Sequence, residues 1–381
     1  MKEGWKYSTI GDLCDKMNGL WKGKIGPFVN VGVIRNANFT KSFTLSFDNI
    51  EYLDVEAKQY QTRKLQKGDL IVEKSGGSEK QPVGRTVLFD REEGEYSFSN
   101  FTSVLRIKDK AVISPEFLYK YILFVYLRGD TRKMQKATTG IHNIEFDKFL
   151  SIPVPKISLS EQQSIVDYLD SAFAKIDAMK ANAEKALNEA KALFQASLKE
   201  MLEPKEGWEV MKLGEFAYMK AGNFVKASEI ISDYKEGLYP CYGGNGFRGY
   251  VKEPNQDGDY CMIGRQGALC GCINRAQGVF RTTEHAVIVK PYKDIPTSLV
   301  YYMLVSLDLN KYATGAAQPG LSVNHIADAV NISVPPIEEQ QHIADTLDSI
   351  KSKVDRLQEN FDKISQECDA LKQAILRQVF E

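Results

Sequence analysis

The stretch from Ser160 to Leu202 constrains the fold more than any other part of the sequence, because it contains no Gly or Pro. Its apolar or small residues recur at alternating steps of four and three, which is the pattern of a helix packed lengthwise on another helix. These positions are Ile165, Leu169, Ala172, Ile176, Met179, Ala183, Ala186, Ala190, Leu193 and Ser197. Such a helix is roughly 60 Å long, longer than a helix confined to one globular core.

The end of the chain has a second stretch with the same spacing. Its apolar positions are Ile343, Leu347, Ile350, Val354, Leu357, Phe361, Ile364, Cys368, Leu371 and Ile375. Both stretches begin with an acidic residue and two glutamines, Glu161-Gln162-Gln163 and Glu339-Gln340-Gln341. We therefore expect two long helices that form an antiparallel coiled coil, each following its own lobe, and that hold the two lobes at a fixed separation.

Short matches outside the helices indicate that the chain is a duplication. Glu3-Gly4-Trp5 recurs as Glu206-Gly207-Trp208, 203 positions later. Gly140-Ile141 with Ile152–Pro155 recurs as Gly320-Leu321 with Ile332–Pro335, 180 positions later. The predicted division is a first lobe at residues 1–155, a helix at 156–205, a second lobe at 206–336 and a helix at 337–381.

Each lobe has the pattern of mixed strands with a late helix, so the predicted class is α+β with a pseudo-twofold repeat. In the first lobe we expect strands at 27–34, 65–73, 85–90 and 97–107, and a helix at 114–128 with Ser114 as N-cap and Pro115 at N1. In the second lobe we expect a glycine-rich turn within 239–250, strands at 259–263, 269–274 and 279–289, and a helix at 297–307.

Composition excludes several classes of protein. No apolar run is long enough to span a membrane and the N-terminus has no signal-peptide pattern, so a cytoplasmic protein with no membrane partner is expected. Six cysteines match no zinc-module spacing, and we expect reduced thiols and no metal. The net charge is −1, but residues 1–155 carry 24 Lys and Arg against 19 Asp and Glu. This local excess is compatible with DNA contact.

Motifs for catalysis or cofactor binding are weak. Gly244–Gly249 fits the dinucleotide-binding glycine pattern but has Pro240 before it and strand-like residues after it, whereas the motif requires a following helix. Asp54–Lys58 has the carboxylate–lysine spacing of a nuclease in a short charged stretch, and Val334-Pro335-Pro336 lacks the Asn or Asp of an amino-methyltransferase. We expect no catalytic residues in this chain.

Two polar, glycine-rich loops are the candidate DNA contacts, because their residue types can reach base edges and phosphates. We expect them at similar positions in the two lobes. The residues are Lys74, Ser75, Gly76, Gly77, Ser78, Lys80, Gln81 and Arg85 in the first lobe, and Tyr242, Gly243, Gly244, Asn245, Arg248, Arg265 and Gln266 in the second. An ordinary solvated loop is the alternative for each.

The whole chain resembles the specificity subunits of type I restriction–modification systems. The resemblance rests on the repeated Glu-Gly-Trp starts, the proline-containing lobe exits and the two Glu-Gln-Gln helix starts. It also rests on two motifs, Ser75–Ser78 with Gln81–Thr86 in the first lobe and Tyr239–Gly246 with Ile263–Gly267 in the second. It implies two target-recognition domains that bind a split target in double-stranded DNA.

The resemblance also implies partners. Two modification subunits would carry S-adenosylmethionine, and restriction subunits would carry ATP and Mg²⁺, with no cofactor in this chain. We expect Glu161, Gln162, Gln163, Glu339, Gln340 and Gln341 to be exposed for the modification subunits. A fused DNA methyltransferase or nuclease, or a coiled-coil scaffold that binds no DNA, are the alternatives.

Overall fold

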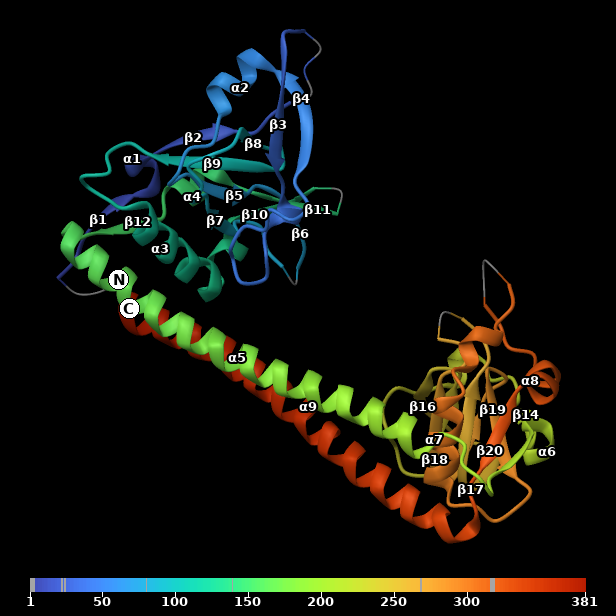
Figure 1. The fold of residues 1–381 in the computed structure, drawn as a ribbon. Helices are drawn as coiled ribbons and strands as arrows, with labels where there is room; N and C mark the ends of the chain where they lie inside the picture. Colours follow the sequence, from blue (N-terminus) through green and yellow to red (C-terminus); the bar gives the residue numbers. More distant parts are fainter. Residues whose placement is uncertain are drawn as a thin grey trace. The chain divides into compact units, whose positions relative to one another are not determined.

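The structure is a computed structural model that describes residues 4–381 except 22, 24, 80, 139, 268 and 316–318. The chain forms two compact units, Met1–Asn182 with Lys363–Glu381, and Ala183–Asp362. Each unit contains one mixed lobe and a stretch of two long helices, α5 (Leu159–Met201) and α9 (Ile337–Phe380) (Figure 1). In the described residues no helix is both long and apolar enough to cross a membrane.

The first lobe is built on a four-stranded sheet of order β2-β9-β5-β7, a three-stranded sheet β4-β3-β8, a three-stranded sheet β10-β11-β6, and the pair β1-β12. The strands are β1 (Lys6–Thr9), β2 (Cys14–Asn18), β3 (Phe28–Ile34), β4 (Glu51–Glu56), β5 (Leu70–Glu73), β6 (Ser75–Gly77), β7 (Thr86–Leu88), β8 (Tyr96–Phe98), β9 (Thr102–Ile107), β10 (Gln135–Thr138), β11 (Ile141–Ile144) and β12 (Pro153–Lys156). The helices are α1 (Ile10–Leu13), α2 (Ala57–Arg63), α3 (Pro115–Arg128) and α4 (Phe146–Leu150).

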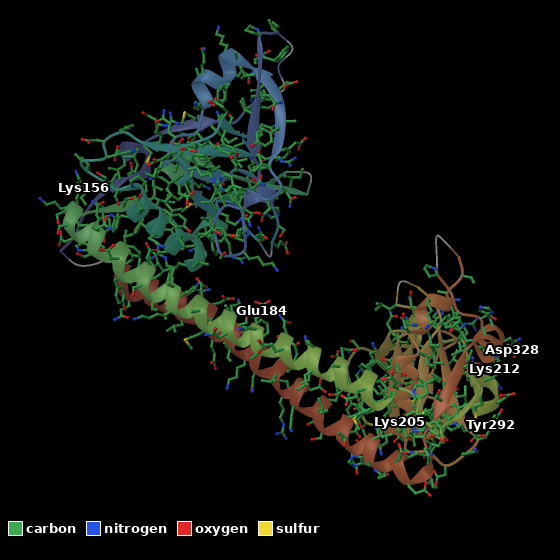
Figure 2. All side chains as sticks on the ribbon, in the orientation of Figure 1. Lys156, Glu184, Lys205, Lys212, Tyr292 and Asp328 are labelled. Carbon is green, nitrogen blue, oxygen red and sulfur yellow. The ribbon has the colours of Figure 1, made fainter. Side chains whose placement is uncertain are left out.

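The second lobe has one six-stranded sheet of order β14-β19-β17-β18-β15-β16 and the pair β13-β20. The strands are β13 (Glu209–Lys212), β14 (Ala217–Ala221), β15 (Tyr239–Gly243), β16 (Gly246–Val251), β17 (Gln256–Gly264), β18 (Ile273–Thr282), β19 (Ala286–Pro291) and β20 (Asn331–Val334). The helices are α6 (Leu213–Phe216), α7 (Thr297–Ser306) and α8 (Val323–Ala329). Lys212 at the end of β13, Tyr292 just after β19 and Asp328 in α8 are labelled in Figure 2.

The strand cores follow from the two-residue period of side-chain direction. In β5, Leu70 and Val72 pack into the core that contains α3, while Ile71 between them packs into the core on the opposite face. The predicted helix at 114–128 is confirmed, with the Ser114 side chain accepting from the Phe117 N–H and Gly129 closing the helix at φ 89°. Both faces of this sheet are therefore covered by core residues. This cover is needed because the strand has few polar side chains that could face water.

α5 and α9 run antiparallel. In the first unit the Lys372 ammonium lies 2.5 Å from the Asp177 carboxylate, and that of Lys180 lies 3.7 Å from Asp369. Phe380 of α9 packs its ring 5.9 Å from that of Phe117 in α3. The second unit has the corresponding arrangement, with Phe194 of α5 stacked edge-on 6.0 Å from Tyr302 of α7, and Tyr302 donating to Asp348 of α9. Each lobe thus packs on both long helices.

The predicted apolar stripe of α5 is partly wrong. Met179, Ala186 and Leu193 are exposed, whereas the buried residues are Leu187, Phe194 and Leu198. Both stripes share Ile176, Ala183 and Ala190, and after Ala183 and Ala190 the buried residue comes four residues later instead of three. A step of four places the larger Leu and Phe side chains against the core, and area buried decides which stripe faces inward.

The expected exposure of the glutamine pairs is also wrong for Gln162 and Gln340. Gln162 is 1% exposed, its side-chain oxygen accepts from the Ser114 N–H at 2.8 Å, and its side-chain nitrogen donates to the carbonyl oxygens of Val112 and Ile157. Gln340 is buried too and donates to the Pro335 carbonyl at 3.0 Å. Each glutamine satisfies backbone groups where a lobe meets its helix. Glu161, Gln163 and Gln341 are exposed, and Glu339 is partly exposed.

We predict that Gln162→Ala leaves the Ser114 amide without its acceptor and lowers the stability of the first unit by about 1–3 kcal/mol. Hydrogen exchange of the Ser114 and Phe117 amides in the full chain measures this. Gln163→Ala is the matched control, because Gln163 is exposed and its side chain donates to the exposed Asp167 one turn away on the same helix. Equal exchange in the two variants would contradict a structural role for Gln162.

Several predicted strands are shorter or divided. The strand predicted at 65–73 begins only at Leu70, because Gly68 adopts φ 95° in a turn before it. The range 97–107 is two strands separated by the turn Ser99–Phe101, and 279–289 is interrupted by the turn Thr283–His285. These two turns matter because they lie at the candidate interface.

Candidate nucleic-acid interface

The same pair of backbone contacts fixes the end of the central strand in each lobe. β5 leads into Lys74, whose N–H donates to the Phe101 carbonyl at 2.9 Å. β17 leads into Arg265, whose N–H donates to the His285 carbonyl at 3.0 Å. The carbonyls of Lys74 and Arg265 accept from Ile144 and Leu321, both at 2.9 Å. Lys74 and Arg265 are therefore equivalent, and each lobe presents a cation at this place.

The turns beside these cations are equivalent as well. The Ser99 N–H donates to the Ile34 carbonyl at 2.9 Å, and the Thr283 N–H donates to the Tyr242 carbonyl at 2.9 Å. Each turn is closed by a hydrogen bond of 3.0 Å, from Thr102 to Ser99 and from Ala286 to Thr283. Ser99–Phe101 and Thr283–His285 therefore occupy one position in a shared framework, although their sequences differ.

This framework corrects the expectation that the loops Lys74–Arg85 and Tyr242–Arg248 occupy similar positions. The Gly84 N–H donates to the Glu73 carbonyl at 2.9 Å, and the Gly271 N–H donates to that of Gly264 at 2.7 Å. Both glycines have φ near 90°. The counterpart of the loop 74–84 is thus the loop 265–271, while Tyr242 lies in β15, whose counterpart is β3.

The exit strands also correct the repeat. Thr9 pairs with Pro153, and Lys212 pairs with Asn331. The lobe exits are therefore 178 positions apart, as are the two Glu-Gln-Gln starts, and not 180. A shift of two residues preserves the alternation of side chains in a strand, so the apolar pattern could not reveal it.

The first-lobe candidates fall into two groups. Gly76, Ser78 and Gln81 are exposed, and Ser78 and Gln81 close a tight turn through the Ser78 hydroxyl, which accepts from the Gln81 N–H at 3.1 Å. Ser75 is buried in β6, and Gly77 pairs with His142 of β11. Lys80 lies outside the described residues. Lys74 is half-buried, and burial together with the nearby Lys16 ammonium holds its pKa below the usual value.

Arg85 does not lie in an exposed loop as predicted. Its guanidinium is paired with the buried Glu73 carboxylate at 3.3 Å and donates to the carbonyls of Asn36 and Phe39. Burial raises the pKa of Glu73, against the opposing attraction of Arg85. Arg85 is therefore a positioning residue that holds the two ends of the 74–84 loop.

The second-lobe candidates divide in the same way. Asn245, Arg248 and Gln266 are exposed. Tyr242 packs its ring edge-on against Phe247 and Phe280, and burial raises the pKa of its hydroxyl. Gly243 and Gly244 are buried, and a side chain on Gly244 would lie 2.9 Å from the His285 carbonyl, so this turn requires glycine beside the turn Thr283–His285.

Sequence reasoning missed the turn residues themselves. The Glu284 carboxylate lies 3.0 Å from His285 Nε2. Four buried polar atoms around this turn have no hydrogen-bond partner among the described residues: Arg265 Nε, Thr283 Oγ1, Glu284 Oε2 and His285 Nδ1. The run Arg281–His285 is polar between Val279-Phe280 and the apolar run Ala286–Val289, and that interruption was the available indication of a turn.

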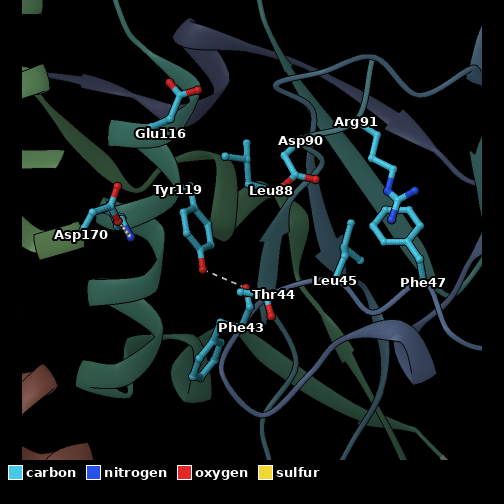
Figure 3. A pocket seen from close by; sticks show the side chains of 11 residues that line it. Phe43, Thr44, Leu45, Phe47, Leu88, Asp90, Arg91, Glu116, Tyr119 and Asp170 are labelled. Carbon is cyan, nitrogen blue, oxygen red and sulfur yellow. Dashed lines mark hydrogen bonds and ion pairs between the residues drawn. The ribbon is translucent and has the colours of Figure 1, made fainter. Parts of the chain in front are cut away.

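Other hollows lie elsewhere in the first unit. One, of about 480 Å³, is bounded by the 43–47 segment, α3 and the end of β7, and Tyr119 closes it by donating to the Phe43 carbonyl at 2.8 Å (Figure 3). Its charged Lys120 is neutralised by Asp170. None of the predicted DNA contacts that the structure describes lines it. The described residues contain no cluster of three or more His, Cys, Asp or Glu arranged to hold a metal ion.

Two copies of one framework, each with a cation and polar turns at one edge, define a tandem recognition protein. The profile of the family described as "Type I restriction modification DNA specificity domain" matches residues 2–189 and 205–366. The chain therefore belongs to the type I restriction–modification DNA specificity family.

Individual relatives agree with this assignment. The specificity subunit of the type I restriction enzyme EcoprrI from Escherichia coli is 38% identical over 252 residues, which cover 64% of this chain and 62% of that subunit. The specificity subunit of EcoKI from Escherichia coli strain K12 is 24% identical, with 100% of this chain and 89% of that subunit covered. The match to the EcoprrI subunit thus extends over less than two thirds of its length.

Solved structures show the same fold. A chain from a study of complex assembly and conformational transition of the type I R-M system superposes with a TM-score of 0.75 at 17% identity, covering 100% of this chain and 98% of that one. The HsdS subunit from Thermoanaerobacter tengcongensis gives a TM-score of 0.53 at 18% identity, with 100% and 97% covered.

We predict that Arg85→Ala destabilises the first lobe by about 3–5 kcal/mol, because it leaves Glu73 buried and unpaired. Without Arg85 the Glu73 pKa rises further, and the penalty applies only to the ionised carboxylate. The lost free energy of unfolding is therefore recovered as pH falls through that raised pKa. The loss relative to the wild type is larger at pH 8 than at pH 5. Hydrogen exchange of β5 and β7 at both pH values measures it.

The double variant Glu73→Gln with Arg85→Ala is the control for this prediction. It removes the buried charge along with its partner, so its deficit should be smaller and independent of pH. A pH-independent deficit in Arg85→Ala alone would show that the Glu73 charge is not what Arg85 compensates.

Proposed function

We propose that this chain is the DNA-recognition subunit of a type I restriction–modification complex, and that each lobe recognises one half of a split target. The observation that carries the proposal is the cation at one shared position in both lobes, Lys74 and Arg265, beside exposed polar side chains that differ between the lobes. A shared framework suits a common substrate, and different side chains suit different base sequences.

The electrostatics of the first lobe favour an anion beside Lys74. Its ammonium is partly desolvated and lies near the Lys16 ammonium, and both effects disfavour its charged form. A DNA phosphate placed between the two cations would remove this penalty, since opposite charge favours the charged form. In the second lobe Arg265 and Arg248 can donate in the fork geometry that matches phosphate or the major-groove edge of guanine.

The remaining chemistry of the complex would reside on other subunits. Two modification subunits would carry S-adenosylmethionine, and restriction subunits would carry ATP and Mg²⁺, while this chain supplies recognition and assembly. The exposed Glu161, Gln163 and Gln341 and the partly exposed Glu339 stay candidates for contacts to the modification subunits. Gln162 and Gln340 would support that surface from beneath.

Methylome sequencing of a host that carries the intact system tests the proposal. We expect one bipartite methylated motif with an unspecified spacer, which disappears when this chain alone is deleted. A motif that survives the deletion would refute a recognition role. Methyl transfer by the isolated chain would support the alternative of a fused methyltransferase, and absence of any gel shift with the motif duplex would support the scaffold alternative.

Substitution of the matched cations gives a quantitative prediction. Lys74→Met and Arg265→Met should each weaken binding of the complex to its target, and each should reduce the slope of log K against log salt by about 0.9 if one phosphate contact is lost. Titration of a labelled duplex at several salt concentrations measures the slope.

Lys110→Met is the control for these variants. Lys110 is exposed and lies just after the end of β9, whereas the turn Ser99–Phe101 lies just before the start of β9. Lys110 is therefore at the opposite end of this strand from the turn. The Lys110→Met variant should show the same slope of log K against log salt as the wild type. Unchanged slopes in both cation variants would mean that these positions do not face phosphate.

A further inference from the structure

The two lobes place an exposed aromatic ring at the same position. The Leu20 N–H donates to the Phe98 carbonyl at 2.9 Å, and the Asn223 N–H donates to the Thr282 carbonyl at 3.2 Å. These residues are equivalent in the shared framework, and each is followed by an aromatic residue. Trp21 is 63% exposed and Phe224 is 69% exposed. A single exposed ring is common on a protein surface, but exposure of a ring at the same position of both lobes points to a contact that the lobes have in common.

Both rings project from backbone that is held in place. The Trp21 N–H donates to Oε1 of Gln59 in α2 at 3.2 Å, and the Ile25 N–H donates to Oε1 of Glu56 at the end of β4 at 2.9 Å, so the backbone is attached at Trp21 and again at Ile25. In the second lobe Val225, next to Phe224, is buried with Cys241 and Val251. Little backbone order would be lost when either ring meets a partner.

Trp21 also lines a cavity of about 580 Å³, together with Leu53 and Phe101. Three buried polar atoms of other lining residues have no partner among the described residues: Arg35 Nε, Asn36 Oδ1 and Ser99 Oγ. Ser99 is 9% exposed and belongs to the turn that contacts Lys74. The side-chain nitrogen of Asn36 donates to the Ser75 carbonyl, so the cavity adjoins β6.

The chemistry of this cavity matches a planar heteroaromatic ring. Aromatic and aliphatic walls can cover the faces of such a ring, and the unpaired donor and acceptors can bond to its edge. Glu51, whose carboxylate is paired with the Arg35 guanidinium, and Asp54 also line the cavity. The lining residues that the structure describes therefore offer no unpaired cation that would favour a phosphate. A neutral nucleobase has a planar ring with polar edges and carries no negative charge, so it suits this lining. The neighbouring 74–84 loop is already a proposed DNA contact.

We propose that Trp21 and Phe224 are base-stacking residues, and that Trp21 holds one locally unstacked base of the first half-site in this cavity. The inference rests on the proposed function, because it requires that the lobes bind DNA. Phe224 makes the corresponding stacking contact at the second half-site. Stacking on an aromatic side chain is tolerant of sequence, so the two rings would add affinity while the polar residues around them distinguish bases.

The test uses the complete complex and target duplexes in which 2-aminopurine replaces single bases, one position at a time. With wild-type protein, fluorescence should change at one position of the first half-site. Trp21→Ala should abolish the change and weaken binding about 5- to 100-fold, and Trp21→Phe should preserve both. Phe224→Ala should weaken binding by a similar factor without affecting the first half-site signal.

Tyr292→Ala is the matched control. Tyr292 is as exposed as Trp21 but follows the far end of β19, roughly 20 Å along the strand from the turn Thr283–His285 (Figure 2). The Tyr292→Ala variant should bind the target duplex with the affinity of the wild type. Tight binding by wild type with no fluorescence change at any position would overturn the stacking proposal and leave the proposed function standing.

Two other outcomes separate the remaining possibilities. If Trp21→Ala retains DNA affinity but fails to assemble with the modification subunits, the ring is a protein contact and the proposal is wrong. If the wild-type complex binds no target duplex at all, the proposed function fails and the stacking proposal with it.

Discussion

One backbone hydrogen bond in each lobe determines the geometry of the candidate interface. The Lys74 amide bonds to the Phe101 carbonyl, and the Arg265 amide bonds to that of His285. Each bond attaches a polar turn to the end of the central strand of the sheet, which is covered by core on both faces. Because the bond involves only main-chain atoms, the side chains around it can differ between the lobes without loss of the framework.

The lobes stabilise that common geometry by different interactions. In the first lobe, Glu73 and Arg85 form a buried ion pair across the base of the loop. Gly264 and Cys272 take their places in the second lobe, where a side chain on Gly264 would overlap the Gly244 carbonyl and the Cys272 thiol donates to that carbonyl at 2.8 Å. An ion pair in the first lobe and a close glycine contact in the second thus join equivalent strands. The loops between these strands, 74–84 and 265–271, differ in length.

The sequence predicted the long helices, the duplication and the late helix of each lobe, because these depend on periodicity and on local capping residues such as Ser114. It failed where tertiary contacts decide. Gln162 resembles a solvated helix start, yet its amide satisfies backbone groups about 50 positions away. Arg85 belongs to a polar stretch, but Glu73 holds it inside the lobe. The pairing of loops between lobes could be recognised only from hydrogen bonds, since loop residues need not share a pattern.

If the shared framework carries two independent sets of recognising side chains, each lobe can be replaced without altering what the other recognises. Exchange of residues 206–336 for the second lobe of another family member tests it most directly, with the methylated motif of the host determined before and after. We expect one half of the motif to change and the other half to be retained. A change in both halves, or in neither, would contradict it.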